Sequence, residues 1–216
     1  MRRRSLLAAA PAVLLAGCVS LLPKEPPAQL YRFGGDLPPA TRAPGALASS
    51  FAVQVLPISF VRASAGDMIL TTTGNEAAYI KGERWVSGAQ GLFEHALANA
   101  FDADQGPARL MAPGEAVPPD YFLKIDVRTF EARYLQGQGA PPTIVVEVYA
   151  ALSIPAERRL AGEHIFSASV PAGANRVGAI ATAFDQATDQ VLEGMVKWVD
   201  ARGQPGQAGA SSARPG

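Results

Sequence analysis

The longest regular pattern in the chain is an alternation of apolar and polar residues between positions 121 and 135. The apolar positions are odd-numbered as far as Val127 and even-numbered from Phe130 onward. Successive side chains of a strand point to opposite faces, so in a regular strand this reversal of phase would turn half of the apolar side chains away from the core. The pattern therefore predicts one long strand with a bulge or sharp coil near Arg128 and Thr129.

Shorter alternating segments predict the other strands. Gly74-Asn75 is a dipeptide suited to positive φ and predicts a tight hairpin, and a second hairpin is expected across residues 157–159. The segment 143–154 has one wholly apolar face, which indicates that this face lies against the core. The predicted strands cover residues 31–33, 51–56, 68–73, 77–81, 109–112, 121–135, 143–154 and 161–170.

Apolar residues spaced three and four positions apart predict two amphipathic helices. The first covers residues 88–101. The second begins at Asn175, whose side chain suits an N-cap, and continues for about seven turns. Its apolar stripe consists of Val177, Ile180, Phe184, Ala187, Val191, Met195 and Trp198.

This order of elements predicts an α+β domain, a mostly antiparallel sheet with two helices packed on one face. The folded domain is expected over residues 31–201. Residues 18–30 are proline-rich and predict an extended tether, which would lift the domain roughly 30 Å per ten residues. Residues 202–216 contain glycine, proline, serine and alanine with little apolar bulk, so a disordered tail is expected there.

The first seventeen residues have the features of an export signal. Three arginines follow Met1, and the apolar run 5–15 would rise only about 16 Å as a helix, half of a bilayer core of about 30 Å. The run ends in Leu15-Ala16-Gly17-Cys18, which resembles the bacterial lipobox. That resemblance implies cleavage before Cys18, a diacylglyceryl group on its thiol and acylation of its new amino group. The alternative is an ordinary secretory leader cut near Ala12, which would leave Cys18 as a lone thiol.

Two or more acyl chains hold a protein on a membrane, so lipidation of Cys18 predicts a domain anchored in the cell envelope and facing the periplasm. Val19 follows the cysteine. By resemblance to sorting in enteric bacteria, the absence of aspartate at this position favours the outer membrane.

Composition and motifs argue against an enzyme. Lysine plus arginine and aspartate plus glutamate each total 19, and loss of the three leader arginines leaves 16 basic against 19 acidic residues, so no strong field favours nucleic acid. A single cysteine excludes an internal disulfide and a multi-thiolate metal site. His95 and His164 stand in no metal-ligand or nucleophile motif. We expect no metal, no catalytic residue and no cofactor beyond the covalent lipid.

Several segments, taken in order, resemble the ABC-type transport auxiliary lipoprotein family, whose members accompany transporters that carry an MCE-type lipid-shuttling subunit. They are the lipobox, Tyr31-Arg32-Phe33, the opening strand 51–57, a hairpin ending in Tyr79 with Trp85 ahead of a helix, and the strand 123–131 that closes on phenylalanine and glutamate. The resemblance covers nearly all of residues 18–199. It implies a sandwich-like fold similar to the amino-terminal domain of TolB.

By this resemblance the protein helps an envelope lipid transporter, docking the MCE-domain protein that works with an ABC permease and ATPase. Tyr31, Phe33, Tyr79 and Trp85 are candidates for the partner contact, because aromatic residues are enriched among interface anchors. The alternative for Trp85 is that it caps the core where hairpin meets helix.

Two other functions stay open. One is a domain that itself carries lipid, with the apolar strand 143–154 lining a cavity, and the other is a general envelope scaffold. The sequence also leaves open whether copies of the domain assemble into a homo-oligomer.

Overall fold

The computed structural model describes residues 27–35 and 50–203. The predicted signal peptide, Cys18, most of the tether and most of the tail lie outside the described residues. The secondary-structure elements, in chain order, are β1 (Gln29–Tyr31), β2 (Phe51–Val55), β3 (Ser59–Phe60), α1 (Arg62–Ala65), β4 (Met68–Thr73), β5 (Glu76–Trp85), α2 (Ala89–Ala103), β6 (Ala108–Leu110), β7 (Tyr121–Arg133), β8 (Thr143–Ile154), β9 (Arg159–Pro171) and α3 (Val177–Arg202).

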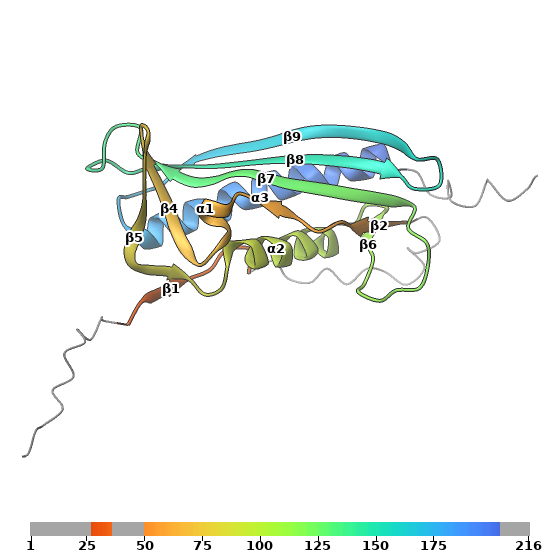
Figure 1. Ribbon diagram of the computed structural model, residues 1–216, viewed down its shortest axis with the longest axis horizontal. Helices are drawn as coiled ribbons and strands as arrows, with labels where there is room; N and C mark the ends of the chain where they lie inside the picture. The colour runs from red at the N-terminus through yellow and green to blue at the C-terminus, as the bar shows by residue number, and fades with distance from the viewer. Residues whose placement is uncertain (1–26, 36–49, 204–216) are drawn as a thin grey trace, which may run out of the picture.

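Strand β7 is the centre of a nine-stranded sheet. Along one edge it pairs with β8 over almost its whole length, and β8 pairs in turn with β9, both antiparallel. Along its other edge β7 pairs in succession with β2, β3 and β4, all parallel to it. In Figure 1 helix α3 passes behind β7 and β8, and α2 lies below β7; both helices share one continuous apolar core with the sheet.

The prediction of a mostly antiparallel sheet is therefore corrected to a mixed sheet. Besides the three partners of β7, the pairs β1–β5 and β2–β6 are parallel. The reason is the path of the chain: β2, β3, α1 and β4 advance in one direction along one edge of β7. Local alternation predicts that a strand exists, but it does not say which way its neighbour runs.

The predicted bulge is confirmed. The register of β7 against β8 shifts between Val127 and Thr129, and the buried positions change there from odd to even numbers. Arg128 is the extra residue, and its guanidinium lies 4.6 Å from the ring centroid of Tyr149 and 3.3 Å from a carboxylate oxygen of Asp126. The bulge keeps both halves of β7 facing the helices.

The β4–β5 hairpin turns at Gly74, whose φ is +58°, as the sequence predicts. The strand after the turn is longer than expected, because Gly82 at φ +76° lies in a bulge opposite Ile69. Beyond the bulge, the last residues of β5 pair with β1.

The two helices follow the predicted apolar faces, but Asn175 is not the N-cap of α3. Arg176 occupies that position, and no side chain caps the helix there. The Asn175 side chain instead accepts a hydrogen bond from the Tyr134 hydroxyl (3.0 Å) and donates one to the carbonyl of Gln138 (2.8 Å). It is used to hold the loop between β7 and β8 against the start of α3.

Aromatic rings form the centre of the core. Phe184 of α3 is fully buried, with ring centroids 4.8 Å from Phe130 and 5.2 Å from Trp85. Phe33 lies 5.1 Å from both Trp85 and Phe130. These contacts join the helix layer, the central strand and the segment that contains β1.

Replacing Phe184 by alanine is expected to lower the free energy of unfolding by about 3 to 5 kcal/mol, because it removes a fully buried ring and leaves a cavity. Urea denaturation followed by circular dichroism measures the change. Leu160, which is 51% exposed, is the matched control. Leu160→Ala should change the stability by less than about 0.5 kcal/mol, and an equal loss in the two variants would contradict the packing described.

Candidate functional site

Three of the four predicted contact residues lie together, but two of them are buried. Tyr31 pairs with Trp85 across β1 and β5, and Phe33 packs edge-on against the Trp85 ring. Phe33 and Trp85 are each only 2% exposed, so their side chains are not available to a partner in this structure. For these two residues the contact prediction is corrected, and Trp85 takes the alternative role of a core residue between hairpin and helix.

Tyr31 and Tyr79 remain accessible to different degrees. Tyr31 is partly buried beside Glu83, and desolvation followed by hydrogen bonding to that carboxylate raises the pKa of its hydroxyl. Tyr79 is 42% exposed and donates a hydrogen bond to the carbonyl of Ala63 (2.8 Å). The four aromatic residues therefore do not form one exposed patch.

The structure gives the amino-terminal segment 29–34 another role, as a part of the fold clamped between sheet and helices. Val86 N–H donates to the carbonyl of Tyr31 (2.7 Å), which extends the β1–β5 pairing. Gly34 N–H donates to a carboxylate oxygen of Asp185 on α3 (2.7 Å), and Asn99 on α2 donates to the Gly34 carbonyl (3.1 Å). Both backbone groups of Gly34 are thus bound by side chains of the two long helices.

Only glycine fits at position 34. Its φ is +68°, in the left-handed region that other residues rarely adopt. A Cβ added there would overlap the side chain of Ala96 on α2. Sequence reasoning missed this site because Gly34 and Asp185 lie 151 residues apart and belong to no motif.

The second feature is an open groove of about 750 Å³ between α2, the chain that follows β2, and the loop after β6. Its apolar lining includes Leu56, Ile58, Leu97, Met111 and Val117. Leu97 is buried at its base, whereas Val117 is 53% exposed on the loop. None of these residues was singled out from the sequence, because they come from three separate segments.

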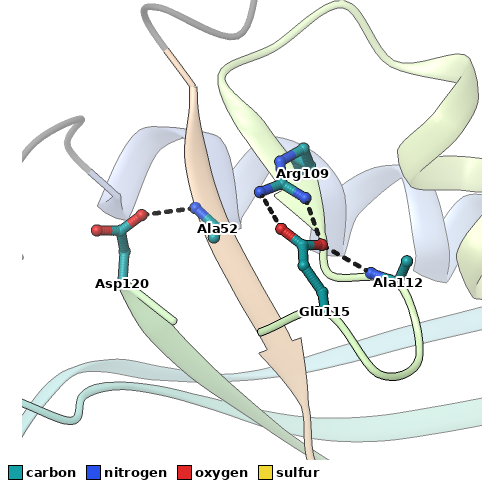
Figure 2. A network of polar contacts seen from close by, with 5 residues as sticks. All are labelled: Ala52, Arg109, Ala112, Glu115 and Asp120. Carbon is teal, nitrogen blue, oxygen red and sulfur yellow. Dashed lines mark hydrogen bonds and ion pairs between the residues drawn. The ribbon is translucent and has the colours of Figure 1, made fainter. Parts of the chain in front are cut away.

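A network of polar contacts fixes the loop that forms one wall of the groove. Figure 2 shows the guanidinium of Arg109 donating two hydrogen bonds to the carboxylate of Glu115, at 2.9 and 2.7 Å. Ala112 N–H donates to the same carboxylate (3.1 Å). The Arg109 bonds, and then the Ala112 bond, lower the pKa of Glu115. Beside them Asp120 accepts a hydrogen bond from Ala52 N–H on β2 (2.7 Å), which ties the far end of the loop to the sheet.

Asp185, Asp189 and Glu193 are spaced four residues apart on α3, and the first of them is the residue that binds Gly34. Burial and then, to a smaller extent, the neighbouring carboxylates of Asp185 and Glu193 together raise the pKa of Asp189 to about 6. Asp189 lies in a small hollow between α2 and α3, lined also by Asp104 and Lys197. At neutral pH the Asp189 carboxylate is therefore ionised in a partly buried position beside two other carboxylates, and this destabilises the folded protein.

The apolar face of β8 does not line a cavity. Ile144, Val146 and Val148 are fully buried, and α3 packs over this strand and β9. The β8 side chains that would line a cavity under the lipid-carrier hypothesis are instead packed in the hydrophobic core.

The two histidines lie on different elements and make unrelated contacts. His95 on α2 shares a hydrogen bond with Asn99 (3.1 Å), and His164 on β9 packs against Phe166 and Trp198. Within residues 27–35 and 50–203, no three histidine, cysteine or acidic side chains are grouped as metal ligands. In the same part of the chain, no helix has the length and apolar character needed to cross a bilayer.

Gly34→Ala is expected to cost about 1 to 3 kcal/mol of stability, because a side chain would strain the positive φ and overlap Ala96. Amide hydrogen exchange should show faster exchange in residues 29–34 than in the unchanged protein. Gly35→Ala is the control, since an added Cβ would meet only the Arg32 side chain at 3.4 Å. Equal exchange in the two variants would show that the segment is not clamped at Gly34.

Asp189→Asn is expected to stabilise the protein by about 1 kcal/mol at pH 7.5, a value reduced to allow for solvent screening of a partly exposed group. Folding raises the pKa of the Asp189 carboxyl, so its protonated form favours the folded state. This contribution to stability is complete at a pH below the pKa of the unfolded chain, and it is lost as the pH rises through about 6. The gain from the substitution should therefore vanish near pH 3.5. Thermal unfolding across this pH range measures it, with exposed Glu76→Gln as the control; a gain independent of pH would contradict the electrostatic cause.

The comparisons with known proteins agree with the fold. A family model described as ABC-type transport auxiliary lipoprotein component matches residues 31–196. The crystal structure of protein XCC0632 from Xanthomonas campestris is similar over 81% of this chain and 96% of its own, with 27% identity and a TM-score of 0.68.

The hypothetical protein CT253 from Chlamydia trachomatis is similar in fold over 71% of this chain and 98% of its own, with 12% identity and a TM-score of 0.51. No curated protein matches the sequence significantly. The family match begins at Tyr31, so it includes Gly34, the helix residues that bind Gly34, and all residues that line the groove. The chain belongs to the family of ABC-type transport auxiliary lipoprotein components.

Proposed function

We propose that this lipoprotein is a non-catalytic docking subunit of an MCE-type ABC transporter for lipids. Cys18 carries the lipid, the tether sets the distance from the membrane, and the domain holds the MCE-domain protein that works with the permease and ATPase. The family description supports the association with an ABC transporter. The cell envelope follows from lipidation, and Val19 favours the outer membrane.

The observation that carries this proposal is the attachment of the amino-terminal segment. The segment nearest the anchor pairs with β5, buries Phe33 among core rings and binds both helices through Gly34. A domain that only had to be retained near a membrane would need a tether but no such clamp. Fixing this segment gives the domain a defined end toward the membrane, which is what a docking role requires.

The two alternatives have less support. A lipid carrier needs an apolar cavity, and the strand proposed to line one is packed against α3. A general scaffold needs no transporter, whereas the family description names one.

The test is affinity purification of the full-length protein from detergent-solubilised membranes of the native bacterium, followed by mass spectrometry. The expected result is recovery of an MCE-domain protein with its permease and ATPase, and a reduced yield with Cys18→Ser. Because Cys18→Ser also blocks leader cleavage, a second control carries an ordinary secretory leader in place of residues 1–18. Recovery of only porins or cell-wall proteins would overturn the transporter assignment in favour of the scaffold.

A further inference from the structure

The groove beside α2 has an acidic rim as well as an apolar floor. Glu94 and Asp102 lie two turns apart on α2 and line it, and both are exposed. Glu115 lines it too, but its charge is neutralised by Arg109. Among the described residues that line the groove, none is basic.

The groove is also held open before any partner arrives. The loop that forms its wall is fixed by the Arg109–Glu115–Ala112 contacts and by Asp120. Glu94 accepts a hydrogen bond from Gln90 (3.0 Å), whose amide also reaches the Ile58 carbonyl across the groove (3.4 Å). Binding to a preformed groove avoids the entropic cost of ordering its walls.

The position of the groove suits a partner. Strands β2 and β6 and the loop after β6 lie at the opposite end of the domain from β1, the element nearest the tether (Figure 1). If the anchor holds the β1 end toward the membrane, the loop wall of the groove is directed away from it.

We propose that this groove binds a protein segment that carries apolar side chains flanked by lysine or arginine. The apolar floor accepts the anchors, a methionine in the lining lets it adapt to their shape, and Glu94 and Asp102 pair with the cations. An anionic phospholipid is disfavoured, because its headgroup would meet the same two carboxylates. The inference rests on the proposed function in one respect, the presence of a protein partner in the envelope.

The test is photocrosslinking in the native bacterium with the full-length lipidated chain. Val117 in the groove is replaced by p-benzoylphenylalanine, and Ile165 on β9, which is 50% exposed, is replaced in the same way as control. The expected product at position 117 is a peptide of another protein with apolar residues and at least two lysines or arginines, which is not captured from position 165. A crosslink to lipid, to an acidic segment, to residues 36–49 of the same chain or to a second copy would overturn the proposal, and so would no crosslink.

Charge reversal tests the acidic rim separately. Glu94→Lys and Asp102→Lys should each lower the crosslink yield at position 117 by about fivefold or more, because repulsion replaces attraction. Glu76→Lys, an equal change of charge on the β4–β5 hairpin, should leave the yield within about twofold. All three residues are exposed, so thermal unfolding should be unchanged. Equal yields from all three variants would overturn the role of the rim.

The two proposals fail in different ways. If the purification recovers the transporter but position 117 crosslinks to no apolar segment with lysines or arginines, the groove assignment fails and the docking function stands. If the purification recovers no transporter subunit but position 117 crosslinks to a basic apolar segment of another protein, the groove assignment stands and the transporter assignment fails.

Discussion

The pairing of β7 on both edges is the constraint on which the rest of the structure depends. One edge is occupied by β8, and the other is divided among β2, β3 and β4. All of these strands must present apolar side chains to the same helix layer, so β7 has to keep its apolar face turned inward throughout. The bulge at Arg128 makes this compatible with a sequence whose apolar phase reverses.

The clamp at Gly34 follows from this core. Phe130, on the far side of the bulge, provides the ring against which Phe33 and Phe184 pack. The buried Phe33 then brings Gly34 between the helices, where Asp185 and Asn99 bind its backbone. The residues that follow the tether are thus part of the hydrophobic core. If Cys18 carries the lipid as proposed, a pull on that anchor is transmitted to the sheet and to both helices and not to a loose end.

The groove is formed by α2, the chain after β2 and the loop after β6, and it is open at the surface of the domain. The buried side of α2 packs on the core, and the turns that carry Glu94 and Asp102 are left to line an open surface. Its other wall is a loop held by the Arg109–Glu115 ion pair and by hydrogen bonds from backbone N–H groups to Glu115 and Asp120. The acidic rim of the groove therefore lies on the exposed face of α2, whereas Leu97 at its base belongs to the core, so the rim can vary in sequence without loss of the fold.

Local patterns in the sequence did not predict β3 or the short helix α1, but they determined the other strands of the sheet, the bulge, the Gly74 turn and the buried faces of the two long helices. These features depend on residues a few positions apart, whose side chains must share one face. The tertiary structure alone decided the parallel pairing along β7, the burial of Phe33 and Trp85, the use of Asn175 as a loop contact, and the clamp and groove. Each of these joins segments far apart in the chain, and a side chain's partner across such a distance is set by how the elements pack, which no local pattern records.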